Sequence, residues 1–463
     1  TVIDFSVVRQ KINAMPSVNK KQNCDDTVLP FELALSKEPL NVDGVVNQQT
    51  LQAHLLLLGK FKELEQKNYE ADMVYLLCAQ DRYIKWLKMM SNYKDEKIVP
   101  LPPIDVAYIW HSHSLAPRKY YEDLKRIHDV NENIGNFPLK ELYNLWLRTG
   151  GMHVDPISQE IWEQKTGEPW ILDLENKKSF VVQCPWCHQE QIFSTSEWVK
   201  IMRTPEHVEK CKSFQCQADW STDTLSAYRF LEDVNKYIAD KSKFLGGALI
   251  DLTGEYTPEL VKTKTELVFS KKWDISNSTC HWSHILNLIE ANITSLKSTN
   301  QLTSALQNFV HRVVSAYSGI PAPFSLDLVS AVLRQRNFTN KMVVNIQISQ
   351  WINQVSVQND AIIRYCKFMH LMNDKPNIPL VPTLDIDLGW HTHILHGQNY
   401  RAWNRKYLLR IINHSDTIPK KTLNDGFVET ESLWSREYKE AYVAPNSPEN
   451  SEKSSCDIYS GGN

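Results

Sequence analysis

The sequence has no hydrophobic run long enough to cross a membrane. Its longest apolar stretch near a predicted helix, residues 55–58, is far short of the roughly 20 residues that a membrane span needs. The polar N-terminal region also lacks the apolar core of a secretory signal. We therefore expect a cytoplasmic protein.

The chain has no large excess of either charge and no obvious set of paired cysteines. Lys and Arg number 51 and Asp and Glu 54, so no overall field draws the protein to nucleic acid or to an anionic membrane. Nine cysteines, an odd and mostly scattered set, fit a reducing compartment. With 463 residues, of which 42% are hydrophobic and 23% charged, the composition predicts a globular protein of two or three domains.

Familiar enzyme motifs are also missing. The sequence shows no nucleophile elbow, phosphate-binding loop, dinucleotide-binding fingerprint or His-Glu-x-x-His zinc-protease motif. This weighs against the well-known enzyme classes and leaves a new one open.

One segment occurs twice and organises the rest of the chain. Residues 101–115 (LPPIDVAYIWHSHSL) and 381–395 (VPTLDIDLGWHTHIL) share a proline, an Asp and a Trp-His-x-His motif at the same spacing. Upstream, residues 82–90 resemble residues 364–372. Downstream, two aromatic residues and a glutamate recur at equal spacing, as Trp162, Glu168 and Trp170 and again as Trp434, Glu440 and Tyr442. The repeated unit exceeds seventy residues, which is the scale of a domain.

Helical periodicity dominates both repeats, most clearly over residues 48–65 and 71–90. The predicted fold is mainly α, with two homologous helical-bundle domains flanking a small ββα-like zinc-binding module. The predicted units are an N-terminal extension (1–46), helical repeat domain 1 (47–176), the zinc module (177–222), a helical connector (223–325), helical repeat domain 2 (326–444) and a disordered tail (445–463).

A cysteine cluster carries the zinc prediction. Cys184 and Cys187 lie between two strand-like segments, residues 179–183 and 191–194. If Thr204 caps a short helix, His207 and Cys211 lie one turn apart on one face of it, and the four side chains form a Cys3His structural zinc site. Cys216 and His188 are the substitutes if one ligand is misassigned, and free buried thiols are the alternative. Four nearby lysines would support nucleic-acid binding by the module: Lys177, Lys178, Lys200 and Lys210.

The paired histidines of the repeated motif have two interpretations. If Asp105 and Asp385 cap helices, residues two apart point in nearly opposite directions, so one pair alone cannot chelate a metal. Asp105, Trp110, His111, His113, Asp385 and Trp390 then form a buried structural motif, in which each histidine bonds to a carbonyl or carboxylate. The alternative is a metal or acid-base site, more plausible in the second repeat because residues 413–416 have no histidine counterpart in the first. Its residues would be His391, His393, His414 and Asp416.

The sequence resembles the glycine-rich domain-containing protein-like family of plants, fungi and some bacteria. The resemblance rests on the two Trp-His-x-His segments, residues 327–335 and residues 413–416, and spans most of residues 48–442. It implies a mainly helical cytoplasmic protein, with plant members connected to development and stress signalling, and no established reaction. Unlike those relatives, the chain has only 15 glycines, no glycine-rich tail and a lone Cys456 near its end.

Three functional hypotheses follow. The first is an intracellular helical scaffold or binding protein with a structural zinc ion and protein partners; a homo-oligomer is compatible with it. The second is a metal-dependent hydrolase or oxidoreductase that uses the histidines of the second repeat. The third is nucleic-acid binding through the zinc module. No catalytic residue can be assigned from the sequence.

Overall fold

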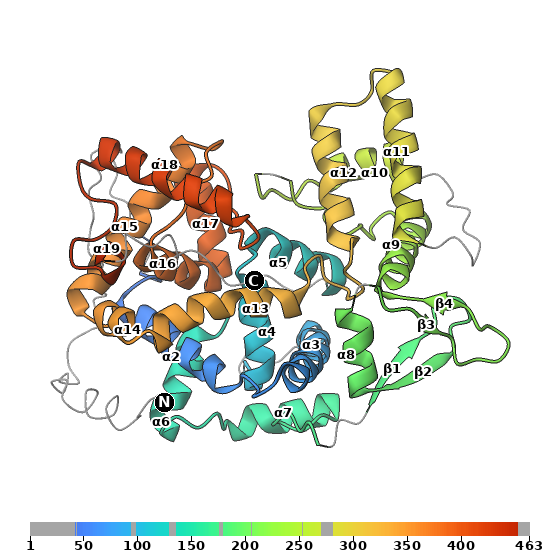
Figure 1. The fold of residues 1–463 in the computed structure, drawn as a ribbon, viewed down its shortest axis with the longest axis horizontal. Helices are drawn as coiled ribbons and strands as arrows, with labels where there is room; N and C mark the ends of the chain where they lie inside the picture. Colours follow the sequence, from blue (N-terminus) through green and yellow to red (C-terminus); the bar gives the residue numbers. More distant parts are fainter. Residues whose placement is uncertain are drawn as a thin grey trace.

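The computed structural model describes residues 42, 44–93, 99–128, 136–175, 179–204, 206–251, 253–269 and 281–451 (Figure 1). Most of the predicted N-terminal extension lies outside the described residues, as do residues 452–463 of the predicted disordered tail. Residues 445–451 are described and include a short helix, α19. Glu449 of α19 is buried and accepts a hydrogen bond from Leu384 N at 3.2 Å.

The described elements are mostly α-helices. In chain order they are α2 (Gln48–Glu63), α3 (Tyr69–Ser91), α4 (Ile104–Ser114), α5 (Pro117–Asp123), the π-helical turn η1 (Leu124–His128), α6 (Leu139–Thr149), α7 (Pro156–Thr166), β1 (Ser179–Gln183), β2 (Glu190–Ser194), α8 (Thr195–Arg203), β3 (Glu209–Lys210), β4 (Asp219–Trp220), α9 (Thr222–Ala239), α10 (Pro258–Phe269), α11 (Trp282–Ser298), α12 (Ser304–Tyr317), α13 (Leu328–Thr339), the π-helical turn η3 (Asn340–Val344), α14 (Ile346–Ile352), α15 (Val355–Asp374), α16 (Leu384–Leu395), α17 (Gly397–Leu408), α18 (Lys420–Tyr438) and α19 (Pro448–Ser451). None of the described helices has the length and apolar character of a membrane span.

Matching contacts confirm the internal repeat. In the first repeat Arg82 of α3 binds Asp105 of α4, with Nε 2.6 Å from Oδ2, and also donates to the carbonyl of Trp170. In the second, Arg364 of α15 binds Asp385 of α16 at the same distance and donates to the carbonyl of Tyr442. The motif tryptophans also correspond: Trp110 donates to Tyr120, and Trp390 donates to Tyr400.

The two aspartates do not cap their helices, contrary to the prediction. Pro103 and Thr383 occupy the N-cap positions, and neither side chain makes a capping hydrogen bond. Asp105 and Asp385 are the second residues of their helices, and each carboxylate binds a buried arginine. Because each helix begins at the residue before its aspartate, the aspartate cannot occupy the N-cap position.

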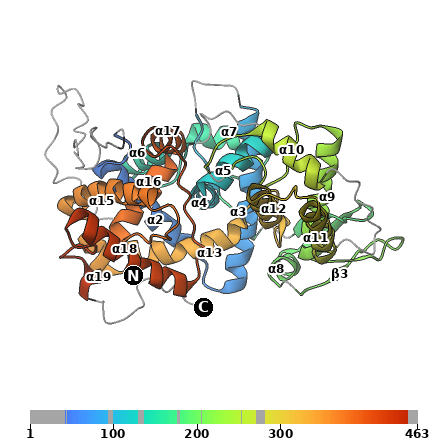
Figure 2. The same cartoon turned by 90° about the horizontal axis from the view of Figure 1, so that it is seen from above.

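The two repeats exchange their first helices and share one core. Helix α13 of the second repeat packs on α3 and α4 of the first, while α2 of the first packs on α15 and α16 of the second. Both ribbon views place α13 beside the first repeat (Figures 1 and 2). A single continuous apolar cluster, from Val42 to Tyr442, includes side chains of both repeats. Each repeat therefore completes the interior of the other.

The connector is a helical bundle with its own apolar core. Helices α9 to α12 project from one end of the molecule (Figure 1). A buried and a partly buried contact join this bundle to the first repeat. Glu122 accepts a hydrogen bond from Leu249 N at 2.9 Å, and Arg126 contacts Asp233 at 3.5 Å.

The predicted strand pair is present in the cysteine module. Strands β1 and β2 pair antiparallel, with Ser179 opposite Ser194, and a second small hairpin pairs β3 with β4. Phe193, Ile201 and Trp220 form a small apolar cluster within the module.

Candidate metal centres

Four cysteines converge at the tips of the two hairpins. One ligand atom from each of Cys184, Cys187, Cys211 and Cys216 lies within 4.8 Å of the others. The sulfurs of Cys184 and Cys216 are 4.0 Å apart, and those of Cys187 and Cys211 are 3.7 Å apart. A tetrahedral zinc ion with Zn–S bonds of about 2.3 Å requires sulfur atoms about 3.8 Å apart. The arrangement fits such an ion.

The turns that present the cysteines share two features. Trp186 N donates to Cys184 Sγ and Ser213 N donates to Cys211 Sγ, both at 3.4 Å. The residues after the second cysteine of each pair, His188 and Gln217, have positive φ values of 57° and 49°. This left-handed residue turns the chain back into the next strand, and the N–H···S bonds orient the first sulfur of each pair.

His207, which was predicted as the fourth ligand, is not part of the cluster. Cys216 occupies that position instead. The expected helix around His207 does not form, because Thr204 ends α8 and residues 209–210 pair as β3. The β3–β4 hairpin brings Cys216 back beside Cys211, while His207 Nε2 contacts Glu209 Oε1 at 3.0 Å. His188 also lies apart, with Nδ1 3.2 Å from the hydroxyl of Tyr228.

The paired histidines of each motif point to different neighbours, as their spacing predicts. His113 contacts Tyr83 and Asp123, at 3.1 and 3.2 Å. Its counterpart, His393, contacts Tyr365 at 2.8 Å and Asn399 at 2.7 Å. These two histidines occupy equivalent buried structural positions. Burial lowers the pKa of His393 to about 3, so this histidine is neutral near pH 7.

The other motif histidine of each repeat faces the centre of the molecule. His111 Nε2 lies 3.0 Å from His54 Nε2, and His54 Nδ1 lies 2.9 Å from Thr392 of α16. Burial lowers the pKa of His111 to about 3. Sequence reasoning missed His54, although a histidine within an apolar helical stretch, between Ala53 and Leu55, is a signal that could have identified it.

A second cluster forms around His391. His391 Nε2 is 3.0 Å from His414 Nε2 and 3.3 Å from Asp387 Oδ1, and His414 Nε2 is 3.8 Å from the same oxygen. Asp387 and His391 lie one turn apart on α16, and His414 follows α17. Burial is the main cause that raises the pKa of Asp387, to about 6.

Two of the four residues predicted for the second site lie outside it. His393 faces Tyr365 and Asn399, and Asp416 binds Arg334, with Oδ2 3.1 Å from Nε. The carboxylate of the cluster comes instead from Asp387, which the sequence analysis did not include among the site residues. Its position four residues before His391 was the available signal, because residues i and i+4 share a helix face.

The second cluster opens into a pocket of about 460 Å³. Asp387, His391 and His414 line it together with Trp390 and residues of α13 and α18. Its wall also carries three cationic side chains, Arg334, Lys341 and Lys420, and a second carboxylate, Asp416.

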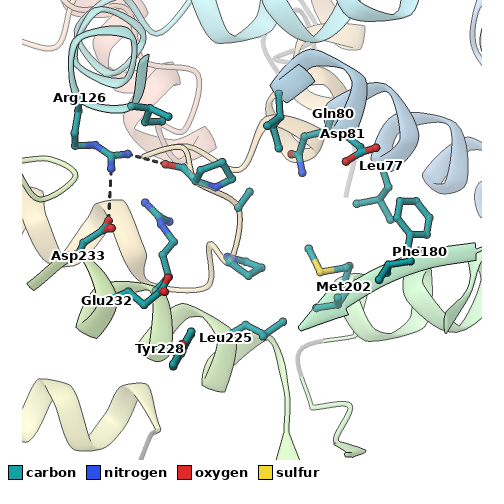
Figure 3. A pocket seen from close by; sticks show the side chains of 18 of the residues that line it. Leu77, Gln80, Asp81, Arg126, Phe180, Met202, Leu225, Tyr228, Glu232 and Asp233 are labelled. Carbon is teal, nitrogen blue, oxygen red and sulfur yellow. Dashed lines mark hydrogen bonds and ion pairs between the residues drawn. The ribbon is translucent and has the colours of Figure 1, made fainter. Parts of the chain in front are cut away.

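A larger pocket, of about 590 Å³, lies where the first repeat, the cysteine module and the connector bundle meet (Figure 3). We call it the junction pocket. Arg126 crosses one side of it and joins Asp233 of α9 to the carbonyl of Pro323. Phe180 and Met202 of the module face the opposite side. Each of the three bodies therefore contributes a wall.

The fold and these clusters define a mainly helical protein with a duplicated histidine-bearing unit and a four-cysteine module. The model of the glycine-rich domain-containing protein-like family matches residues 42–123 and 282–403. The resemblance predicted from the Trp-His-x-His segments is thereby confirmed. The first match includes His54 and His111, and the second includes Asp387 and His391.

Two relatives from Arabidopsis thaliana share part of the chain. Glycine-rich domain-containing protein 1 is 34% identical over 125 residues, and glycine-rich domain-containing protein 2 is 36% identical over 124 residues. Each alignment covers 25% of this chain but only 14% and 15%, respectively, of the relative's own length. No solved structure matches the chain.

Proposed function

We propose that the protein is an intracellular helical binding protein in which a structural zinc ion supports one wall of its ligand-binding region. The observation that carries this proposal is the convergence of four cysteine sulfurs at the spacing of a tetrahedral zinc site. Four protein ligands leave no coordination position for a substrate, so this ion would stabilise the module and take no part in a reaction.

The connection to binding is the junction pocket. Phe180, which lines the pocket, lies in β1, the strand that leads into the turn with Cys184. Trp198 and Met202 of α8 line the pocket beside Phe180. Aromatic side chains and arginine are enriched in protein interfaces, and the pocket combines aromatic residues of two bodies with Arg126 and Arg229. We therefore place the binding surface for a protein partner there. The thiolates must stay reduced to hold zinc, which favours the cytoplasm.

The experiment compares zinc content and peptide binding in three full-length proteins: wild type, Cys216→Ser and His207→Ala. Peptides are first selected on the wild type from a displayed library, and their affinities are then measured for all three. Cys216→Ser should lose one zinc ion per chain and bind the selected peptides at least tenfold more weakly. His207→Ala should retain both properties, because His207 contacts Glu209 and no cysteine of the cluster.

Two results would contradict the proposal. If zinc content is equal in wild type and Cys216→Ser, the four cysteines do not form the site. If the zinc ion is lost while every selected peptide binds with unchanged affinity, the module does not support the binding surface. A folded variant is confirmed by hydrogen exchange in α3 and α15, which lie in the shared core.

A further inference from the structure

Asp387, His391 and His414 form a second constellation that differs in kind from the cysteine cluster. We propose that these three side chains bind a divalent metal ion whose open coordination position faces the adjoining pocket and takes a small oxyanion, either a phosphate or a carboxylate. This site is separate from the cysteine module, since its ligands come from α16 and from the segment after α17.

The distances fit three ligands of one ion. The ligand atoms are 3.0, 3.3 and 3.8 Å apart, and they lie within the span of a single cluster. In a tetrahedral site with bonds of about 2.0 to 2.1 Å, ligand atoms lie about 3.3 Å apart. Two imidazoles and one carboxylate with an open position are also the ligand set of many catalytic metal sites.

The hydrogen bonds around the cluster orient its atoms as metal ligands. His414 Nδ1 lies 3.0 Å from the carbonyl of Leu115, so it carries the proton, and in the neutral ring Nε2 presents a lone pair to Asp387 and His391. A metal-bound histidine is usually held in this way, with its second nitrogen donating to a carbonyl. The first repeat thus positions a side chain of the second.

Hydrogen bonds among the three side chains leave a buried carboxylate oxygen of this cluster without a donor. Asp387 Oδ1 is buried and forms no hydrogen bond with any residue in the described ranges, although His391 Nε2 lies 3.3 Å away. One cation would satisfy Asp387 Oδ1 and both Nε2 atoms at once, and so relieve the cost of placing an unpaired carboxylate oxygen beside them.

The pocket beside the cluster favours an anionic ligand. Arg334, Lys341 and Lys420 outnumber the two carboxylates of its wall, Asp387 and Asp416, by one charge even before a divalent ion adds two more. Arg334 contacts Asp416 through Nε, while its Nη2 is buried and donates to no residue that the structure describes. A phosphate or carboxylate oxygen can accept a hydrogen bond from Nη2, because guanidinium groups bind both kinds of oxyanion.

The first repeat provides an internal control. His111 corresponds to His391, and its Nε2 faces His54 Nε2 at 3.0 Å. Ala107 stands where the second repeat has Asp387, and among the described residues no group of possible metal ligands forms around this pair. His54 and His111 are both buried and line neither of the two pockets described above. The same repeated motif therefore predicts metal binding at only one of its two copies.

The test uses the full-length Cys216→Ser protein, which removes the four-cysteine site and makes failure of that site a separate result. The protein is stripped with chelator, loaded with Co²⁺, and measured for bound metal and for its visible absorption. One equivalent of Co²⁺ without a thiolate charge-transfer band is expected. Adding His414→Ala should abolish at least nine-tenths of this binding, whereas adding His111→Ala should leave it intact.

The oxyanion is then tested by titrating inorganic phosphate and acetate into the Co²⁺-loaded protein. A saturable change in the Co²⁺ spectrum with either anion is expected, and Arg334→Gln should weaken that binding at least fivefold without loss of the metal. Equal metal content with and without His414→Ala would overturn the site. An unchanged spectrum with both anions would overturn the ligand assignment. A response to phosphate alone or acetate alone identifies which oxyanion the pocket takes.

Discussion

Removing the carboxylate of Asp105 should weaken the first repeat by several kilocalories per mole. The Arg82 and Asp105 side chains are each only 2% exposed, so the change to alanine leaves a buried guanidinium whose remaining carboxylate neighbour is Glu168, at 3.8 Å. Removal of one partner from such a pair costs about 3 to 5 kcal/mol. Arg82 still donates to the carbonyls of Pro169 and Trp170, at 2.7 and 2.9 Å. We therefore expect a cost near the lower limit, about 3 kcal/mol.

Hydrogen exchange measures this cost where it arises, in the peptide that contains α4. A loss of about 3 kcal/mol raises the exchange rate more than 100-fold for amides that exchange through opening of the core. Asp81→Ala is the matched control, because Asp81 forms a partly exposed pair with Lys85 in α3, and ion pairs in contact with solvent contribute about 0.5 kcal/mol. Less than a tenfold increase in α4 for Asp105→Ala would refute the reasoning.

The repeat offers an independent comparison. Asp385→Ala leaves Arg364 in the same position, with a side chain that is 9% exposed and still bonded to the carbonyl of Tyr442. Exchange in α16 should therefore rise by a factor within tenfold of that in α4. A larger difference would mean that the two ion pairs are equivalent in geometry but not in energy.

Two further changes test burial at other positions. Burial raises the pKa of Glu122 to about 7, so the contribution of Glu122 to stability is present at low pH and is lost as the pH rises from about 4.5 through 7. Glu122→Gln should remove up to about 3 kcal/mol of this pH dependence, measured as thermal midpoints from pH 5 to 8. Equal pH profiles for both proteins would contradict the prediction. Gly426→Ala places a Cβ atom 2.5 Å from the carbonyl oxygen of Pro379 and should lower the free energy of unfolding in denaturant by about 1 to 3 kcal/mol. As a control, Glu429→Ala changes an exposed residue of the same helix and should change stability by about 0.5 kcal/mol or less. Equal stabilities of the two variants would show that the chain at Pro379 moves freely.

The repeat and most helices could be predicted because their signals are local. Apolar spacing predicted helices over residues 48–65 and 71–90, and the structure has α2 and α3 there. The strand pair around Cys184 was likewise recognisable from two short apolar segments and the turn between them. Similar spacing of tryptophan, histidine and arginine in the two copies predicted the repeat, and the equivalent contacts of Arg82 and Arg364 agree with it.

The ligands of both clusters were harder to assign, because they depend on turns and on segments far apart in the chain. Local pattern placed His207 on a helix with Cys211, but the hairpin that forms there brings in Cys216. In the second repeat, His393 and Asp416 were plausible by proximity in sequence. The packing of α15 and α13 assigns His393 to Tyr365 and Asp416 to Arg334.

The sequence by itself determined that two related helical units exist, where their histidine helices lie, and that a pair of cysteines sits in a strand turn. These are consequences of periodicity and spacing, which act over a few turns of chain. Tertiary structure decided that the units exchange α2 and α13, that His54 meets His111, and that Leu115 of one repeat orients His414 of the other. Those contacts join residues tens to hundreds of positions apart, and only burial of the shared core selects them.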